Sequence, residues 1–219
     1  MTIFQYINQN PKVLLPLNKN EVIKIQKEVE NDAFYGAGIR LLGDIIKAKK
    51  LNTNPNEVID KIVIINALNS TNLQTQKSTV KNIANAIKEC ANFDTLLKNG
   101  DKKAVDIIAL ANKNERINFS FATKYCAYHS YYLYNDDFSI YDNFVSIILP
   151  FYAKPLGIEI SQTKLKEYKE KCDYESFNNV IKEVLKGYKL DKEKQIRRQF
   201  DHFLWWQGKQ INEILKKQK

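Results

Sequence analysis

A lysine and an aspartate in this chain have the types and the spacing that nucleophilic chemistry on a sugar needs. Lys124 lies in the segment NFSFATKYCAYH (residues 118–129), and Asp142 follows just under twenty residues later in FSIYDNFV (residues 138–145). An uncharged primary amine attacks an electrophilic carbon, and burial favours the uncharged form of an amine. A carboxylate stabilises positive charge that develops on a sugar and accepts a proton. Each residue also has a plainer interpretation: a solvated surface lysine, and a helix N-cap that contributes ~1 kcal/mol.

The segment that holds this pair resembles the active-site segment of the helix-hairpin-helix DNA glycosylases, especially the 8-oxoguanine glycosylase branch. In that superfamily a lysine opens one helix and an aspartate stands at the start of the next, and Lys124 and Asp142 match those positions. The stretch IINALNSTNL (residues 64–73) is similar to the helix end from which a polar side chain enters the duplex. Together these segments span roughly residues 58–152.

This resemblance implies an activity and a role for each member of the pair. The expected protein is a bifunctional DNA glycosylase and AP lyase that excises an oxidised purine such as 8-oxoguanine. The resemblance implies that Lys124 is the nucleophile that forms a Schiff base with the sugar. It implies that Asp142 stabilises charge and accepts a proton. Two alternatives remain: a catalytically inactive nucleic-acid-binding protein of the same fold, and a protein-interaction module.

Several polar or basic side chains are candidates for contact with damaged duplex DNA. Those at the matched helix end and before the lysine are Asn69, Ser70, Asn72, Arg116, Asn118 and Ser120. In the superfamily a glycine-rich turn precedes the lysine helix, and its backbone amides bind a DNA phosphate. The corresponding stretch NERIN (residues 114–118) has no glycine. We therefore expect a rebuilt hairpin in which Arg116 contacts phosphate and Asn118 or Ser120 caps the helix.

Aromatic residues crowd the same region and are candidates for stacking on an extruded base. The residues assigned to this base pocket are Tyr125, Tyr128, His129 and Tyr141. The same stripe also fits a helix that packs in the core. The segment QIRRQFDHFLWWQGK (residues 195–209) carries a similar ambiguity, because it can lie along DNA or pack its aromatic residues inward, and we favour packing.

The charge balance favours a polyanionic partner. The 34 basic residues outnumber the 25 acidic residues, which gives a formal charge of +9 that attracts nucleic acid or anionic lipid. Plain solubility is the alternative explanation. No run of ~18 apolar residues and no signal-peptide pattern is visible, so we expect a cytoplasmic protein that does not enter a membrane and acts as a monomer.

The cysteines and histidines predict neither a disulfide framework nor a metal site. Cys90, Cys126 and Cys172 are odd in number and far apart, which fits a reducing compartment. Cys126 and His129 have the spacing of two zinc ligands, but His202 is the only other histidine. The four clustered cysteines that hold an iron–sulfur cluster in some relatives are missing. No metal and no cofactor is expected.

The elements that must position these residues are all helices. The apolar periodicity predicts an all-α fold, and the resemblance specifies a compact helix-hairpin-helix glycosylase-like fold over residues 1–219. The length allows one core or two helical lobes flanking a cleft. Residues 62–65 could form a buried strand, but no partner strand is visible. The predicted helices cover about 18–32, 33–50, 54–66, 73–90, 93–98, 102–112, 119–134, 143–152, 163–171, 174–186, 192–206 and 209–219.

Overall fold

The computed structural model describes residues 1–69, 71, 73, 77–114 and 116–218. Within these residues the chain is helical and contains no strand, as the periodicity predicts. The first elements are α1 (Ile3–Gln9), the 3₁₀ turn η1 (Pro11–Val13), α2 (Lys19–Asn31), α3 (Tyr35–Ala48), α4 (Pro55–Asn69), α5 (Lys77–Glu89), α6 (Phe93–Lys98) and α7 (Lys103–Ala109). The remaining elements are α8 (Phe119–Leu133), α9 (Asn143–Ala153), η3 (Lys154–Leu156), α10 (Gln162–Glu170), α11 (Tyr174–Gly187) and α12 (Ile196–Lys217).

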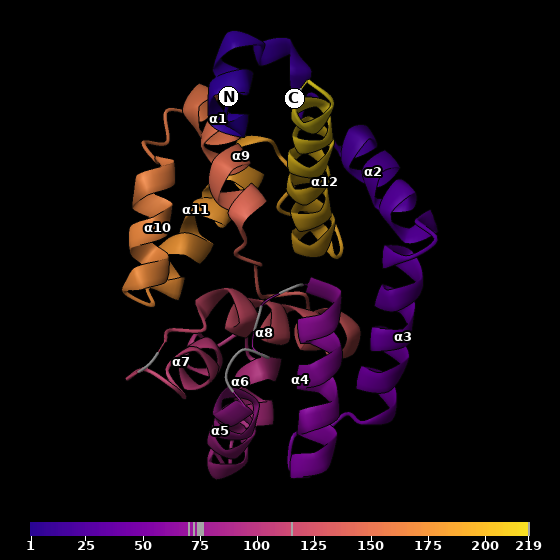
Figure 1. The fold of residues 1–219 in the computed structure, drawn as a ribbon, viewed down its shortest axis with the longest axis vertical. Coiled ribbons are helices and arrows are strands. Elements are labelled where there is room, and N and C mark those ends of the chain that lie inside the picture. The colour runs from indigo at the N-terminus through magenta and orange to yellow at the C-terminus, as the bar shows by residue number, and fades with distance from the viewer. Residues whose placement is uncertain (70, 72, 74–76, 115, 219) are drawn as a thin grey trace.

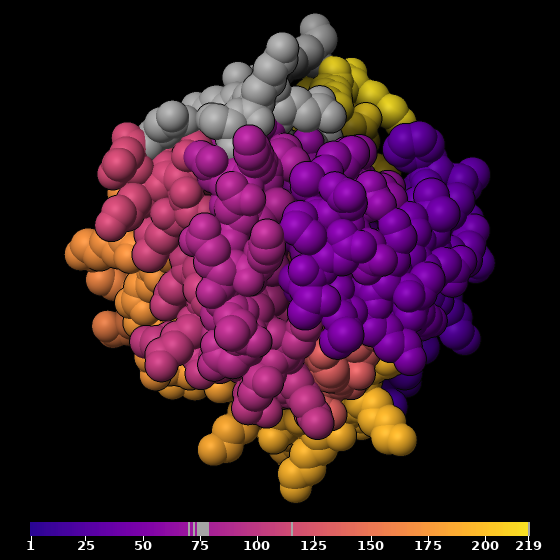
Figure 2. Space-filling view, turned by 90° about the horizontal axis from the view of Figure 1, so that it is seen from below, coloured from indigo at the N-terminus to yellow at the C-terminus, as the bar shows by residue number. Residues whose placement is uncertain are grey.

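The helices form two groups in space. Helices α3 to α8 make the lower group in Figure 1, and α1, α2 and α9 to α12 make the upper group. Helices α2 and α3 run end to end along one edge and join the groups, and the two termini lie close together at the top. Seen from below, the surface comes mostly from α3 to α6, while the later helices show only at the margin (Figure 2).

Helix α8 is the central element of the lower group. Nearly every side chain from Phe119 to Ser130 is buried, on all faces of the helix. It packs on α7, α3, α4 and α6, and also on α10 of the upper group. A helix buried all round is typical of the middle of a helical domain, and its side chains are held in fixed positions by their neighbours.

Short polar side chains start several helices, including the one that begins after the predicted cap Asp142. Asn18, Asp142, Ser161 and Asp173 each accept a hydrogen bond from the backbone of the third residue onward, which satisfies one of the free amides at a helix start. Residues 62–65 belong to α4, so the helical prediction for this apolar run is confirmed.

Two predictions at the chain ends are wrong. No helix was predicted before residue 18, but α1 lies there and starts with a capping box formed by Thr2 and Gln5. The two helices predicted for residues 192–206 and 209–219 are the single helix α12, which passes through Gly208. Gly208 is buried against Phe144 of α9, where a Cβ atom would lie 2.5 Å from the phenyl ring. The glycine therefore permits a close approach of two helices rather than ending one.

Candidate functional site

A cavity of about 680 Å³ lies where the two groups of helices meet. The lower group contributes side chains from the end of α4 and the start of α8, and the upper group contributes the start of α9 and parts of α10 and α12. We call it the central cavity. Its volume is in the range of ~300–1,000 Å³ that is usual for small-molecule sites.

Lys124 lines this cavity from the second turn of α8. The residue is 6% exposed, and its Nζ donates to Ser120 Oγ at 3.3 Å. It forms no ion pair with any residue that the structure describes. The amine is therefore held by a neutral hydroxyl one helical turn earlier, not by a carboxylate.

Asp142 lines the same cavity from the start of α9. Its Oδ1 accepts the backbone amide of Val145 at 2.8 Å, so the predicted N-cap is confirmed. Within the described part of the chain its second carboxylate oxygen has no hydrogen-bond partner. One oxygen thus has a structural task, and the other is available to a ligand in the cavity.

Two hydroxyl groups on α8 fix the position of α9 relative to Lys124. Ser120 Oγ donates to the Tyr141 carbonyl at 2.9 Å, and the Tyr141 amide donates to Thr123 Oγ1 at 3.0 Å. Both backbone groups of the residue before Asp142 are therefore bonded to α8. This pair of contacts holds the aspartate beside the helix that carries the lysine.

The other candidate DNA contacts are divided between the cavity and residues outside the described ranges. Asn69, Arg116, Asn118 and Ser120 line the central cavity. Ser70 and Asn72 lie outside the described residues. Asn69 ends α4, and its Oδ1 accepts from Tyr128 Oη at 3.1 Å. Arg116 is exposed and reaches the Thr71 carbonyl at 3.4 Å.

Asn118 has an unusual environment for an amide side chain. It is 2% exposed, and neither its Oδ1 nor its Nδ2 has a hydrogen-bond partner among the residues that the structure describes. It precedes α8 but does not cap it, and Ser120 bonds Tyr141 instead, so the expectation that one of them caps this helix is wrong. Buried amides without partners are rare and costly, which makes this one a candidate ligand contact.

The four aromatic residues assigned to the base pocket lie in different surroundings. Tyr141 lines the central cavity, whereas Tyr125, Tyr128 and His129 do not. Tyr125 and His129 stack on each other with ring centroids 4.2 Å apart in the core between α8 and its neighbours. Burial raises the pKa of Tyr125 and, with the nearby Lys61, lowers the pKa of His129 to about 3. These two side chains lie in the core and do not line the cavity, because α8 is buried on every face.

Other aromatic side chains form the cavity wall, and the sequence analysis did not select them. Tyr35 and Trp205 stack at 4.7 Å with an angle of 19° between their planes. Both line the cavity together with Phe121 and Phe144. Trp205 lies in the segment for which packing was favoured, and Phe200, Phe203 and Leu204 of that segment are indeed buried. No pattern in the sequence links Tyr35 to the other cavity residues, because Tyr35 comes from a distant part of the chain.

Helix α10 supplies positive charge at the mouth of the cavity. Lys166 and Lys169 line the cavity and are exposed, and neither forms an ion pair with a described residue. Glu170 is the acidic neighbour on the same helix. The signal in the sequence was weak, because α10 is rich in lysine on all sides.

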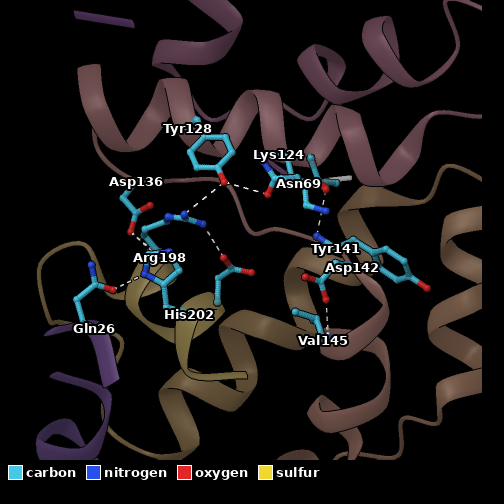
Figure 3. A network of polar contacts seen from close by, with 12 residues as sticks. Gln26, Asn69, Lys124, Tyr128, Asp136, Tyr141, Asp142, Val145, Arg198 and His202 are labelled. Carbon is cyan, nitrogen blue, oxygen red and sulfur yellow. Dashed lines mark hydrogen bonds and ion pairs between the residues drawn. The ribbon is translucent and has the colours of Figure 1, made fainter. Parts of the chain in front are cut away.

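A buried polar network lies behind the cavity and connects α12 with α8 and α4 (Figure 3). Arg198 pairs with Asp201 at 2.6 Å, and its guanidinium lies 4.6 Å from the centre of the Tyr128 ring. Tyr128 Oη in turn bonds Asn69. Burial raises the pKa of Asp201 against the lowering effect of Arg198, while the charges of Asp142 and Lys124 also act on it. Asp201 therefore lies within electrostatic range of the lysine and aspartate pair.

The described residues contain neither a metal-binding cluster nor a membrane-spanning helix. Among them no group of three or more histidine, cysteine, aspartate and glutamate side chains is arranged to hold a metal ion. No helix built from these residues combines the length and the apolar character that crossing a bilayer needs.

Comparisons with known proteins give one family and one relative. The family model HI_0787_N, described as an N-terminal domain, matches residues 20–136. A Haemophilus influenzae protein with the printed name "Uncharacterized protein" is 30% identical over 209 residues, which cover 90% of this chain and 93% of that protein. No solved structure matches the chain. The family match includes Lys124 and ends before Asp142.

Proposed function

This chain belongs to the HI_0787_N family, and we propose that it is a DNA glycosylase with AP-lyase activity. The observation that carries the proposal is that Lys124 and Asp142, chosen from the sequence, line one cavity of about 680 Å³. Neither the family description nor the name of the relative states an activity, so the proposal rests on this site and on the resemblance of its segment. The partner is damaged duplex DNA, bound by a monomer in the cytoplasm.

In the proposed reaction the Lys124 amine supplies the electron pair for a new C1′–N bond, which replaces the bond to the damaged base. The nitrogen attacks C1′ of the damaged nucleotide, the glycosidic bond breaks, and its electrons leave with the base, which takes up a proton. The free oxygen of Asp142 stabilises the positive charge on the sugar and accepts the proton that the amine loses. Opening of the sugar ring then gives a Schiff base between Lys124 and C1′. β-Elimination breaks the DNA strand on the 3′ side of the damaged nucleotide.

The walls of the cavity suit an extruded base. The Asn118 amide offers an NH2 donor group and an acceptor oxygen that have no partner among the described residues, which matches the hydrogen-bonding edge of a base. Tyr141, Phe121 and Phe144 supply aromatic surface beside it. The favoured substrate is an oxidised purine such as 8-oxoguanine, on the resemblance alone.

The mouth of the cavity suits a DNA backbone. Arg116, Lys166 and Lys169 are exposed there, and each phosphate that such a side chain neutralises adds about one unit to the salt dependence of binding. The same three charges favour the alternative function, a helical protein that binds nucleic acid without catalysis. Binding and chemistry must therefore be measured separately.

Borohydride trapping tests the proposal. The protein is incubated with duplexes that carry 8-oxoguanine, uracil, an alkylated base or an abasic site, and the reductant converts any Schiff base into a stable adduct. We expect an adduct with wild type and none with Lys124→Gln. The matched control is Lys169→Gln, which removes another lysine of the same cavity, weakens DNA binding, and leaves the adduct at saturating protein.

Each outcome of this assay decides between the functions. An adduct that survives in Lys124→Gln refutes the assigned nucleophile. Salt-sensitive DNA affinity without adduct or base release favours the catalytically inactive binding protein. Absence of both affinity and product refutes a role in DNA chemistry and leaves the protein-interaction module.

A further inference from the structure

A second cavity, of about 480 Å³, lies on the side of α12 that faces α2 and α3. Its lining comes from α2, α3, α8 and α12, and none of its residues lines the central cavity. We call it the α3 cavity. It plays no part in the proposed glycosylase reaction.

Two buried side chains on one face of α12 line the α3 cavity and have atoms without partners. Arg198 is 2% exposed and His202, one helical turn later, is 1% exposed. Within the described part of the chain, Arg198 Nε and His202 Nε2 have no hydrogen-bond partner. A guanidinium Nε always carries a hydrogen, so it presents a donor. Leaving such groups unsatisfied is costly, which points to a ligand that supplies the missing partners.

The neighbouring bonds define what His202 presents. Gln26 Nε2 donates to Glu30 Oε1 at 2.6 Å, so Gln26 Oε1 is the atom that lies 2.5 Å from His202 Nδ1. That oxygen only accepts, and Nδ1 therefore carries the hydrogen. Burial, and secondly the charge of Arg198, lowers the pKa of His202 well below its usual range. The ring is neutral, and its Nε2 is a bare acceptor on the residue one helical turn after Arg198.

The mouth of the α3 cavity carries balanced charge. Its exposed lining residues include two cations, Arg40 and Lys47, and two anions, Glu30 and Asp44. A carboxylate or phosphate ligand would gain little net attraction there. A carboxylate would also leave the bare nitrogen of the histidine unpaired, because it has no hydrogen to donate.

Aromatic surface completes the α3 cavity. Tyr131 and Tyr132 line it side by side, with ring centroids 4.9 Å apart. Gly43 on α3 allows Tyr132 to pack closely, since a Cβ atom there would lie 2.6 Å from the ring. A flat ligand can therefore contact tyrosine surface while its edge faces α12.

We propose that the α3 cavity binds a neutral heterocycle with an N–H next to a carbonyl, the edge of a uracil or hypoxanthine ring. The ligand N–H donates to His202 Nε2, and its carbonyl accepts from Arg198 Nε. No covalent step is involved. This site stands whether or not the central cavity has glycosylase activity.

Ligand-detected NMR and calorimetry on the full chain test the proposal with uridine and inosine as probes. The matched ligands are 3-methyluridine and 1-methylinosine, which lack the N–H and should bind at least about tenfold more weakly. Tyr131→Ala removes aromatic surface from the cavity at a half-buried position and should also weaken uridine binding. Tyr134→Ala, one turn of helix away and not part of the lining, is the matched control.

The outcomes separate this site from the central cavity. Binding of uridine that is lost in Tyr131→Ala and kept in Tyr134→Ala and Lys124→Gln supports the proposal. The proposal is overturned if neither nucleoside binds at concentrations up to about 10 mM, a limit that corresponds to a binding free energy weaker than ~3 kcal/mol. Equal binding of the methylated nucleosides overturns it too, as does binding that depends on Lys124 but not on Tyr131.

Discussion

Replacing Asp142 by asparagine separates its structural role from its chemical role. The Asp142 carboxylate caps α9 through a 2.8 Å bond from Val145 to Oδ1, and asparagine caps a helix about as well as aspartate. The variant should therefore fold with nearly unchanged stability. What it loses is the negative charge and the proton-accepting oxygen in the central cavity.

The expected magnitudes follow from these two roles. Loss of a positioned acid or base typically slows a reaction by ~10²–10⁴-fold, so Asp142→Asn should retain about 1% of turnover or less. Asp142→Ala should lose the same activity and in addition ~1 kcal/mol of stability from the missing cap. For a chain of this length ~1 kcal/mol lowers Tm by about 2–4 °C.

Single-turnover base release from an 8-oxoguanine duplex, with a thermal melt of each variant, measures both effects. Asp173 provides the matched control, because it caps α11 through Ser176 at 3.1 Å and does not line the central cavity. Asp173→Ala should lower Tm like Asp142→Ala and leave base release unchanged. The reasoning fails if Asp142→Asn releases base at the wild-type rate, or if Asp173→Ala loses activity to the same extent.

Three further predictions concern stability. Gly208→Ala should lower the free energy of unfolding by ~1–3 kcal/mol in urea, because the new Cβ would lie 2.6 Å from Phe144 Cβ. Gly38→Ala, whose nearest atom is the flexible end of a leucine, should cost less, and equal costs would contradict this packing argument. Burial lowers the pKa of His129 to about 3, so as the pH falls the histidine of the unfolded chain is protonated before that of the folded chain. The stability that comes from the neutral ring is therefore fully present above pH 6.5 and is lost at lower pH. At pH 5 the free energy of unfolding should be lower by ~2 kcal/mol. His129→Gln should flatten the dependence of urea stability on pH between 7.5 and 5, and an unchanged slope would refute the assignment. Lys61→Met should lower the free energy of unfolding by ~2–4 kcal/mol, since the buried ammonium bonds three oxygens. The carbonyls of Lys49 and Leu51 would lose this donor, whereas Asn52 Oδ1 would keep Tyr125 Oη. A neutral result in urea would show that the two carbonyls find other partners.

Local signals in the sequence predicted the helix starts well. Asp142 was selected as a cap from its type and position, and it bonds the expected amide. Asn18, the first residue of a predicted helix, also caps that helix. Such caps involve residues three positions apart, so the sequence contains all the information they need. The helical assignment of residues 62–65 worked for a related reason, because a lone strand has no partner to satisfy its backbone.

Packing between distant segments was not predictable in the same way. The break predicted between residues 206 and 209 contains Gly208, and glycine weakens an isolated helix by ~1 kcal/mol. Its effect here depends on Phe144, more than sixty residues earlier in the chain, which approaches too closely for any larger residue. Likewise Tyr35 joins the central cavity only because it stacks on Trp205 of the last helix. Neither contact leaves a periodic pattern in the sequence.

The aromatic stripe of α8 shows why the choice of side chains for the site succeeded only in part. Periodicity selects a face when one side of a helix is polar, but α8 is buried on all sides. Tyr125 and His129 therefore looked equivalent to Tyr141 in the sequence, although they lie in the core. Asn118, Arg198 and His202 have buried polar atoms without a hydrogen-bond partner among the described residues. Such atoms can be identified only once the neighbours of each side chain are known.

The relation between Lys124 and Asp142 depends on α8 more than on the distance between them in the sequence. The two residues belong to different groups of helices, and a loop joins them, so spacing alone would allow many arrangements. Ser120 and Thr123 remove that freedom, because their hydroxyl groups bond both backbone groups of the residue that precedes the aspartate. Ser120 also accepts the bond from the lysine amine, so the same hydroxyl positions both members of the pair. A serine four residues before the lysine is therefore as much a part of this site as the two charged side chains.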